Sequence, residues 1–316
     1  MQLRSNYLPK DFIETRQGLI FAVVDPVVEQ GHVLCFLRYV RENGVCRKHD
    51  TAAANAYLTD RYPQYLYHST RLDARLHAVP VAEISRHFQP EAVLKTLPAM
   101  SRPDAVVAGL SKLLALLQTQ SVDPNALGIT GSVLISAQNA NSDIDLVCYE
   151  RAVFNQCRVA VQNLIETGRL QQLNDEDWQA SYRRRGCALS FPEYLWHEQR
   201  KANKAIIDGR KFDLSLVLTT PAKSYGSVKK LGKTVIQCRI SDDQYGFDYP
   251  AEFRADHATI TAIVSYTATY NGQARVGEWV EACGTLEQDA QGLLRMVIGS
   301  DREAQGEYLK VIPDHA

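Results

Sequence analysis

Residues 127–149 read LGITGSVLISAQNANSDIDLVCY, and this stretch decides the fold of the central part of the chain. It contains an apolar run, a Gly-Ser pair, a polar spacer and a second apolar run that two aspartates interrupt. Asp143 and Asp145 are separated by one residue, and side chains at positions i and i+2 of a strand point to the same face. The sequence therefore predicts two carboxylates side by side, with apolar neighbours facing a core.

Two adjacent carboxylates repel, and each raises the pKa of the other unless a cation lies between them. Oxygen ligands of this kind favour Mg²⁺ or Mn²⁺. Gly131 and Ser132 add a second signal, because a strand that ends in Gly-Ser at the start of a helix offers N–H groups and a hydroxyl to a phosphate. Ser142 directly precedes the first aspartate. The combination predicts a site for a metal and a nucleotide, and two solvated aspartates on an edge strand are the simpler alternative.

A third acid interrupts another apolar strand. In KFDLSLVL, residues 211–218, Asp213 alternates with apolar residues, so its carboxylate faces away from the core. Asp208, in the preceding turn, is the weaker alternative. We expect Asp143, Asp145 and Asp213 to converge on neighbouring strands as catalytic residues and metal ligands.

A family resemblance rests on Gly131-Ser132, the spacer and Ser142-Asp143-Ile144-Asp145-Leu146. This pattern resembles the signature of the DNA polymerase β-type nucleotidyltransferase superfamily, which includes tRNA CCA-adding enzymes, poly(A) polymerases and antibiotic adenylyltransferases. With its supporting elements the resemblance covers about residues 101–220. The whole chain also resembles a group of uncharacterised, mostly archaeal predicted nucleotidyltransferases with a similar C-terminal β segment.

The resemblance implies transfer of a nucleoside monophosphate from a nucleoside triphosphate, with ATP favoured, to a hydroxyl, and release of pyrophosphate. Asp143 and Asp145 would hold two metal ions, and Asp213 would complete the second and help to deprotonate the acceptor. Gly131 and Ser132 would bind the β- and γ-phosphates.

Basic residues supply further candidates for phosphate binding. The segment HEQRKANK places His197, Lys201 and Lys204 at i, i+4 and i+7, the spacing of one helical face. We expect Lys201 and Lys204 to bind the triphosphate or an RNA acceptor, with a solvated surface as the alternative. The wider stretch 183–233 has an excess of basic residues, which suits a phosphate-bearing partner such as RNA. Protein and small-molecule acceptors remain candidates as well.

The chain of 316 residues is 45% hydrophobic and 22% charged, a globular composition with room for two or three domains. β-rich runs at 18–25 and 32–40 and a helical stretch near 50–60 open it, and a helix expected from Ser101 follows. The fold class is therefore α/β (α+β). The expected domains are an N-terminal α/β unit (1–100), a central polymerase β-like domain of mixed sheet and flanking helices (101–220) and a C-terminal all-β barrel or sandwich of about five strands (221–316).

Asn271-Gly272 separates two β-rich runs of the C-terminal segment, and Asn-Gly is a strong hairpin signal. We therefore expect a hairpin there. No aromatic motif of the RNP type marks this segment as a nucleic-acid reader. Trp279 and Tyr266 are accordingly expected in its core.

Seven scattered cysteines without a Cys-x-x-Cys pair argue against a disulfide framework or a zinc knuckle and favour a reducing cytoplasm. No apolar run approaches the roughly 20 residues of a membrane span, and the N-terminus lacks the pattern of a signal peptide. We expect a cytoplasmic protein without a membrane partner. The sequence leaves the oligomeric state open.

Two other classes of function stay open. One is a catalytically silent module of the same fold that binds a nucleotide or RNA. The other is a structural or regulatory partner protein whose β domain mediates oligomerisation. The presence of all three acids favours the enzyme.

Overall fold

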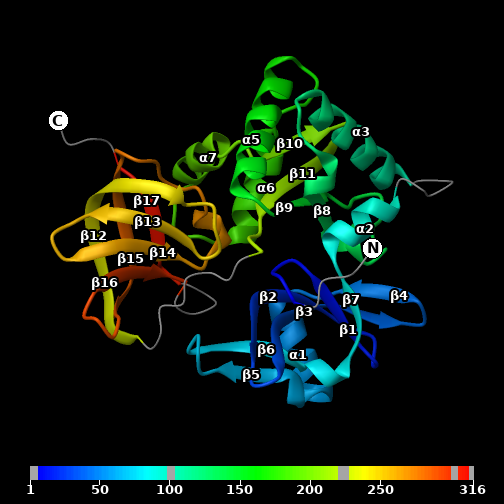
Figure 1. Ribbon diagram of the computed structural model, residues 1–316, viewed down its shortest axis with the longest axis horizontal. Coiled ribbons are helices and arrows are strands. Elements are labelled where there is room, and N and C mark those ends of the chain that lie inside the picture. Colours follow the sequence, from blue (N-terminus) through cyan, green and yellow to red (C-terminus); the bar gives the residue numbers. More distant parts are fainter. Residues whose placement is uncertain (1–5, 98–103, 220–227, 300–304, 313–316) are drawn as a thin grey trace. The chain divides into compact units, whose positions relative to one another are not determined.

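The structure is a computed structural model that divides into two compact units (Figure 1). It describes residues 6–97, 104–219, 228–299 and 305–312. Unit 1 combines Met1–Gln172 with Asn203–Pro221, and unit 2 combines Leu173–Ala202 with Ala222–Ala316. The architecture is mixed α and β, and the described strands form sheets of seven, four and six strands.

The N-terminal part of unit 1 is an antiparallel sheet with helix α1 (Thr51–Arg61) packed on one face. Its strands lie in the order β5-β6-β3-β2-β1-β7, and β4 pairs with β3. Their bounds are β1 Phe12–Thr15, β2 Leu19–Glu29, β3 His32–Glu42, β4 Val45–Lys48, β5 Leu66–Ser69, β6 Ala74–Pro80 and β7 Ile84–Phe88. The two β-rich runs and the helix expected near 50–60 are confirmed.

The central sheet of unit 1 has the order β10-β11-β9-β8. Its strands are β8 Leu127–Thr130, β9 Ile144–Cys148, β10 Lys204–Ile207 and β11 Arg210–Leu216. The middle strands β9 and β11 run parallel, and each outer strand is antiparallel to its neighbour. Alternation along β9 and β11 buries Ile144, Leu146 and Leu214 on the apolar face.

Helices α3 (Ala105–Thr119) and α5 (Arg151–Glu166) cover that apolar face. The position that a Cβ on Gly109 of α3 would take is 3.7 Å from Cδ1 of Ile144, and Sγ of Cys157 in α5 is 3.8 Å from Sγ of Cys148. Asp104 caps α3 by accepting hydrogen bonds from two backbone N–H groups of its first turn. The expected start at Ser101 lies outside the described residues.

Unit 1 also contains two short helices: α2 (Pro90–Thr96), which follows β7, and α4 (Gly131–Leu134), which links β8 to β9. An apolar cluster contains side chains from the N-terminal sheet and from the end of α4; its buried members are Phe12, Ile20, Tyr39, Phe88, Leu134 and Ile135. We call this set the joining cluster. It attaches the N-terminal sheet to the segment that follows Gly131.

Unit 2 contains a closed β barrel. Its strands are β12 Lys229–Tyr245, β13 Ala251–Asp256, β14 Ile260–Ser265, β15 Trp279–Gln288, β16 Leu294–Ile298 and β17 Tyr308–Val311. They lie in the order β12-β13-β14-β16-β15-β17, and additional pairing of β12 with β15 closes a ring of five strands. Strands β14 and β16 are parallel. A barrel, rather than a sandwich, is thus the form of the C-terminal β region.

Helices α6 (Asp175–Arg185) and α7 (Phe191–Arg200) also belong to unit 2. Trp178 and Tyr194 from these helices share one apolar core with Phe253 of the barrel. The sequence assigns this segment to the central domain, whereas its apolar faces are buried in the barrel's core. Periodicity identifies an apolar face but not the element that covers it.

The hairpin expected at Asn271-Gly272 is wrong. Strand β14 pairs with β13 and β16 rather than with β15, and Ala268–Tyr270 form a 3₁₀ turn. Gly272 has a φ of +62°, and a Cβ there would overlap the ring of Phe247. Its N–H donates to the carbonyl oxygen of Gly246 at 2.6 Å. Close packing, not a two-residue turn, explains the glycine.

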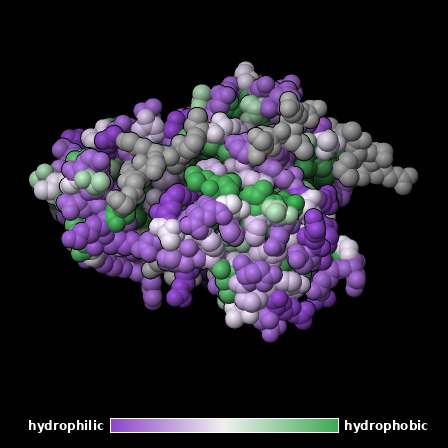
Figure 2. Space-filling view, turned by 60° about the horizontal axis from the view of Figure 1, so that its bottom comes forward, coloured by the Kyte–Doolittle hydropathy of each residue, from purple (hydrophilic) through white to green (hydrophobic). Residues whose placement is uncertain are grey.

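Hydrophilic residues predominate on the face that Figure 2 shows.

The two aromatic residues expected in the core of the C-terminal region differ in burial. Trp279 is 38% exposed, while Tyr266 packs beside a small apolar cluster of the barrel. None of the helices in the described parts of the chain is long and apolar enough to cross a lipid bilayer.

Candidate active site

One row of side chains crosses the central sheet at the second aspartate. Asp145 of β9 lies opposite Asp213 of β11 and opposite Thr130 of β8. Lys204 of β10 lies opposite Asp213. Directly opposite residues on neighbouring strands point to the same face. The order across the sheet is therefore lysine, aspartate, aspartate, threonine, with the two carboxylates adjacent.

Asp143 lies in the loop just before β9 and is half-buried. Arg210, the first residue of β11, holds this loop by donating hydrogen bonds to the carbonyl oxygens of Ala140, at 3.1 Å, and of Ser142. The hydroxyl of Ser142 accepts a hydrogen bond from the N–H of Asn139 at 2.9 Å. Ser142, predicted as part of the nucleotide-binding site, shapes the loop that carries Asp143. Arg210 is a positioning residue that the sequence did not reveal.

Gly131 packs directly against the Asp145 carboxylate. Its φ is +70°, and a Cβ at this position would overlap Oδ2 of Asp145. Gly131 and Ser132 begin α4, and the first N–H groups of a helix have no partner within the helix. The carboxylate and the start of the helix therefore lie at the same corner of the site.

Burial raises the pKa of Asp145, the Asp213 carboxylate raises it further, and Asp143 acts in the same direction. A divalent cation beside these oxygens would relieve the repulsion, and hard oxygen donors fit Mg²⁺ or Mn²⁺. Among the described residues, no three Asp, Glu, His or Cys side chains form a ready-made metal cage. Mg²⁺ commonly uses one or two carboxylates together with substrate phosphates. The adjacent pair fits that mode of binding.

Two lysines from the N-terminal part of unit 1, Lys10 in the turn before β1 and Lys48 at the end of β4, act on the same carboxylate. The charges of Lys10 and Lys48 lower the pKa of Asp145, against the larger effects that raise it. The carbonyl oxygen of Lys10 accepts a hydrogen bond from Oγ1 of Thr130 at 2.7 Å. Neither lysine belongs to the motif, so reasoning from residues 101–220 missed both.

Asp208, the weaker candidate for the third acid, lies in the turn between β10 and β11. Its side chain is 57% exposed and forms an ion pair with Lys112. The structure thus places Asp213, and not Asp208, beside Asp145.

The single helical face expected for His197, Lys201 and Lys204 is wrong, because α7 ends at Arg200 and Lys204 begins β10. Lys201 is 3% exposed, and its ammonium donates to Oε1 of Glu198 and to a barrel carbonyl, each at 2.6 Å. Lys204, in contrast, lies in the row beside Asp213. A phosphate-binding role for Lys201 stays a prediction.

The basic stretch 183–233 is divided between the units. Arg183, Arg184 and Arg185 are exposed in the last turn of α6 in unit 2, and Lys204 lies in unit 1. Lys223 lies outside the described residues.

His197 is a buried link within unit 2. Its Nδ1 donates to the carbonyl oxygen of Glu193 at 2.7 Å, and its Nε2 accepts from the N–H of Val311 at 3.0 Å. Burial, together with the charges of Lys201 and Arg200, lowers its pKa from 6.5 to about 4. The neutral ring is therefore the form that holds α7 to β17.

Acid is expected to destabilise the protein through His197. Because the folded-state pKa lies below the unfolded value, this contribution is complete above pH 6.5 and declines as the pH falls toward 4. The loss is about 2 kcal/mol between pH 7 and pH 5. Urea unfolding of the full chain at both pH values should show a smaller loss for His197→Gln than for wild type. The exposed control His68→Gln should behave as wild type, and equal losses in all three would contradict the assignment.

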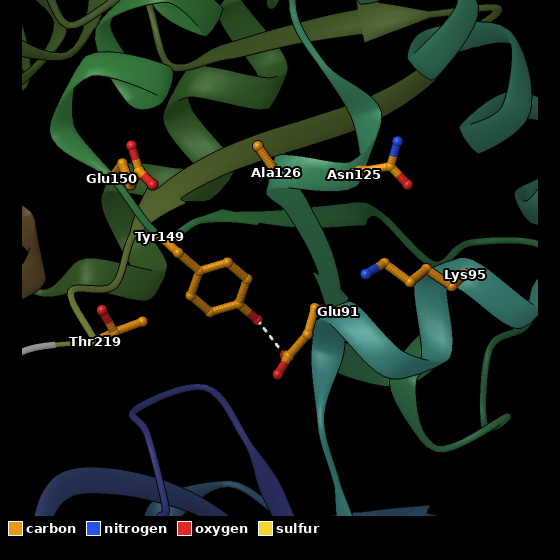
Figure 3. Close-up of a pocket in the computed structure, with 7 residues that line it drawn as sticks. All are labelled: Glu91, Lys95, Asn125, Ala126, Tyr149, Glu150 and Thr219. Carbon is orange, nitrogen blue, oxygen red and sulfur yellow. Dashed lines mark hydrogen bonds between the residues drawn. The ribbon is translucent and has the colours of Figure 1, made fainter. Parts of the chain in front are cut away.

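A separate pocket of about 270 Å³ lies near the carboxyl end of β9 in unit 1 (Figure 3). It is lined by Glu91, Lys95, Asn125, Ala126, Tyr149, Glu150 and Thr219. The hydroxyl of Tyr149 donates to Oε2 of Glu91 at 2.7 Å and ties α2 to the end of the strand. None of the three candidate catalytic aspartates lines this pocket.

No protein-family model matches the chain, and no solved structure matches it significantly. An uncharacterized protein of Methanocaldococcus jannaschii, MJ1086, is 31% identical to it over 333 residues. The alignment covers 96% of this chain and 98% of the relative, so the similarity includes both units. The chain therefore belongs to the same family as MJ1086.

Proposed function

We propose that the protein is a metal-dependent nucleotidyltransferase of the cytoplasm that moves a nucleoside monophosphate from a nucleoside triphosphate, ATP above others, to a hydroxyl acceptor. One observation carries the proposal. Asp145 and Asp213 lie in register on adjacent parallel strands, and Gly131 at the start of α4 packs against the first of them. This arrangement places two carboxylates where a phosphate can also approach a helix start.

The three aspartates then have defined tasks. Asp145, Asp213 and Asp143 supply the oxygen ligands for Mg²⁺ or Mn²⁺. When bound, the cation would draw the triphosphate oxygens together and lower the pKa of the acceptor hydroxyl. A carboxylate oxygen of Asp213 takes the acceptor's proton. The acceptor oxygen then bonds to the α-phosphorus, the bond from that phosphorus to the bridging oxygen breaks, and pyrophosphate leaves.

The remaining residues orient the nucleotide. Gly131 and Ser132 present backbone N–H groups to the β- and γ-phosphates, and Lys204 flanks Asp213 with a positive charge. Arg210 keeps Asp143 at the end of β9 through the loop carbonyls. Little covalent chemistry falls to the protein, because such enzymes act mainly by positioning and charge stabilisation.

The test is a screen of the four labelled nucleoside triphosphates, each with Mg²⁺ or Mn²⁺, against RNA, protein and small-molecule acceptors. We expect label on one acceptor class and release of pyrophosphate, both abolished by chelation of the metal. An RNA acceptor should also bind with a steep dependence on salt that weakens when Arg183, Arg184 and Arg185 become Ala.

A silent nucleotide- or RNA-binding module is the alternative. It would bind the triphosphate and metal without transferring label to any acceptor. Tight binding of the triphosphate and metal, with no pyrophosphate release across the whole screen, would favour the binding module over the enzyme.

A further inference from the structure

We propose that Lys10, in the turn before β1, and Lys48, at the end of β4, bind the β- and γ-phosphates of the nucleotide and so make the N-terminal part of unit 1 a part of the substrate site. This inference rests on the proposed function for the identity of the nucleotide, but it assigns residues outside the motif. Three structural features support it: the N-terminal sheet packs against the residues after Gly131, the Lys10 backbone is held at Thr130 in a strained conformation, and both lysines are exposed beside the acidic pair.

The N-terminal sheet is fixed against the motif by packing. In the joining cluster, Tyr39 and other sheet residues share a core with Leu134 and Ile135, which follow Gly131 directly in the chain. Lys48 lies opposite Tyr39 in the β3–β4 pair. The end of β4 that carries Lys48 is therefore held against the segment that follows Gly131.

Lys10 is held still more directly. Its carbonyl oxygen accepts the 2.7 Å hydrogen bond from Thr130, the residue opposite Asp145 in the row. It lies in a tight turn after Pro9, closed by a hydrogen bond of 3.0 Å from the N–H of Asp11 to the carbonyl oxygen of Leu8. The turn places Lys10 at the edge of the site, on the side of Asp145 away from Asp213.

The backbone of Lys10 is strained. Its φ is +74°, a region in which glycine is favoured and a residue with a Cβ is destabilised. A glycine would satisfy the turn after Pro9 better than a lysine does. A lysine at such a position is explained if its side chain is needed, and strained positions of this kind cluster at functional sites.

The charges complement a polyphosphate. Lys10 and Lys48 are exposed, and within the part of the chain that the structure describes neither has a carboxylate at salt-bridge distance. The Lys10 backbone contacts Thr130, the neighbour of Asp145 in the row, and Lys48 lies opposite Tyr39 of the joining cluster. Lys204 flanks the acidic pair on the other side. Positive charges thus border the carboxylates on both sides, and a triphosphate bound with a metal would meet them.

The experiment measures binding of the full-length protein to two probes by isothermal titration, each with Mg²⁺: inorganic tripolyphosphate and a non-hydrolysable ATP analogue. Lys10→Gly and Lys48→Gln should each weaken both probes about tenfold, and the double variant about a hundredfold. Lys112→Gln is the matched control, because it removes the same charge from an exposed lysine whose partner is Asp208. Its affinities should equal those of wild type.

Stability separates binding from a structural role. Lys10→Gly removes a left-handed lysine and should melt no earlier than wild type. Gln30→Gly, at an exposed position with φ of +48°, relieves the same kind of strain away from the site and should leave binding unchanged. A Lys10→Gly variant that melts much earlier would indicate that the lysine serves the fold, and would overturn its assignment as a ligand.

The outcomes also separate this inference from the proposed function. Equal affinity of wild type and the double variant for both probes overturns the inference and leaves the proposed function untouched. Binding that depends on the two lysines, in a protein that transfers no label to any acceptor, supports the inference and overturns the proposed enzymatic function. Wild type that binds neither probe overturns both.

Discussion

Replacing Asp145 by Asn is expected to reduce nucleotidyl transfer by on the order of 1,000-fold. The amide keeps the shape of the side chain but removes one anionic ligand from the pair that Asp145 forms with Asp213. Metal-dependent binding of the nucleotide should weaken at the same time. The measurement is pyrophosphate release at saturating Mg²⁺, with the acceptor that the screen identifies.

Asp208→Asn is the matched control. It makes the same chemical change in the same unit, but Asp208 is exposed and paired with Lys112 instead of facing Asp145. We expect turnover of this variant to stay close to wild type. Equal losses in both variants would show that the decrease at Asp145 does not report a metal ligand.

Stability is expected to move in the opposite direction from activity. The pKa of Asp145 is raised by burial and by Asp213, so its ionised form is disfavoured in the folded protein. For a carboxyl group shifted in this direction, stability is lost as the pH rises through its pKa. Without metal at neutral pH, Asp145→Asn should therefore melt at or above the temperature of wild type. When Mg²⁺ and a non-hydrolysable ATP analogue are added, the melting temperature of wild type should rise by more than that of Asp145→Asn. A variant that melts much earlier without metal would point to a structural role.

The two aspartates on strands β9 and β11 could be predicted from the sequence. Alternation in β9 and β11 assigns Asp145 and Asp213 to polar faces, because a period of two determines which side chains share a face. It does not determine which strands are neighbours, and the pairing of β9 with β11 joins segments far apart in the sequence. The resemblance supplied that neighbour relation, and the structure places the two residues opposite each other.

The parts that could not be predicted depend on contacts between distant segments. Lys10 meets Thr130 of the row through a hydrogen bond between segments 120 residues apart in the chain. Lys204 was placed on a helix because the spacing from His197 fits one, yet Lys204 begins strand β10. The spacing of a few residues does not distinguish a continuing helix from a helix followed by a strand. Tertiary packing decides between the two.

Gly272 is a second position at which a local sequence signal predicted the wrong structure. Asn-Gly is a genuine turn signal, but a glycine is also required wherever another side chain approaches the backbone closely. The ring of Phe247 occupies that space in the barrel. A single sequence does not distinguish these two reasons for glycine.

The second large effect is expected at Gly131. Gly131→Ala should reduce nucleotidyl transfer by about 100-fold or more, because displacement of a reacting group by about 1 Å is enough for such a loss. The added Cβ would overlap Oδ2 of Asp145, so either the carboxylate leaves its place beside Asp213 or the start of α4 shifts away from the phosphates. The positive φ of +70° adds backbone strain. Stability should fall by about 2–4 kcal/mol in total.

Gly168→Ala separates the two causes. Gly168 has nearly the same backbone, with a φ of +69°, but no atom lies within 4 Å of the position that its Cβ would take. This variant should lose only the strain of about 1–2 kcal/mol and keep full activity. The excess loss in Gly131→Ala then measures the contact with Asp145. In an Asp145→Ala background, the Oδ2 atom is gone, and the stability losses of the two glycine variants should become similar. If Gly131→Ala is as active as Gly168→Ala, Gly131 does not set the position of the carboxylate, and the residues of the row hold it without Gly131.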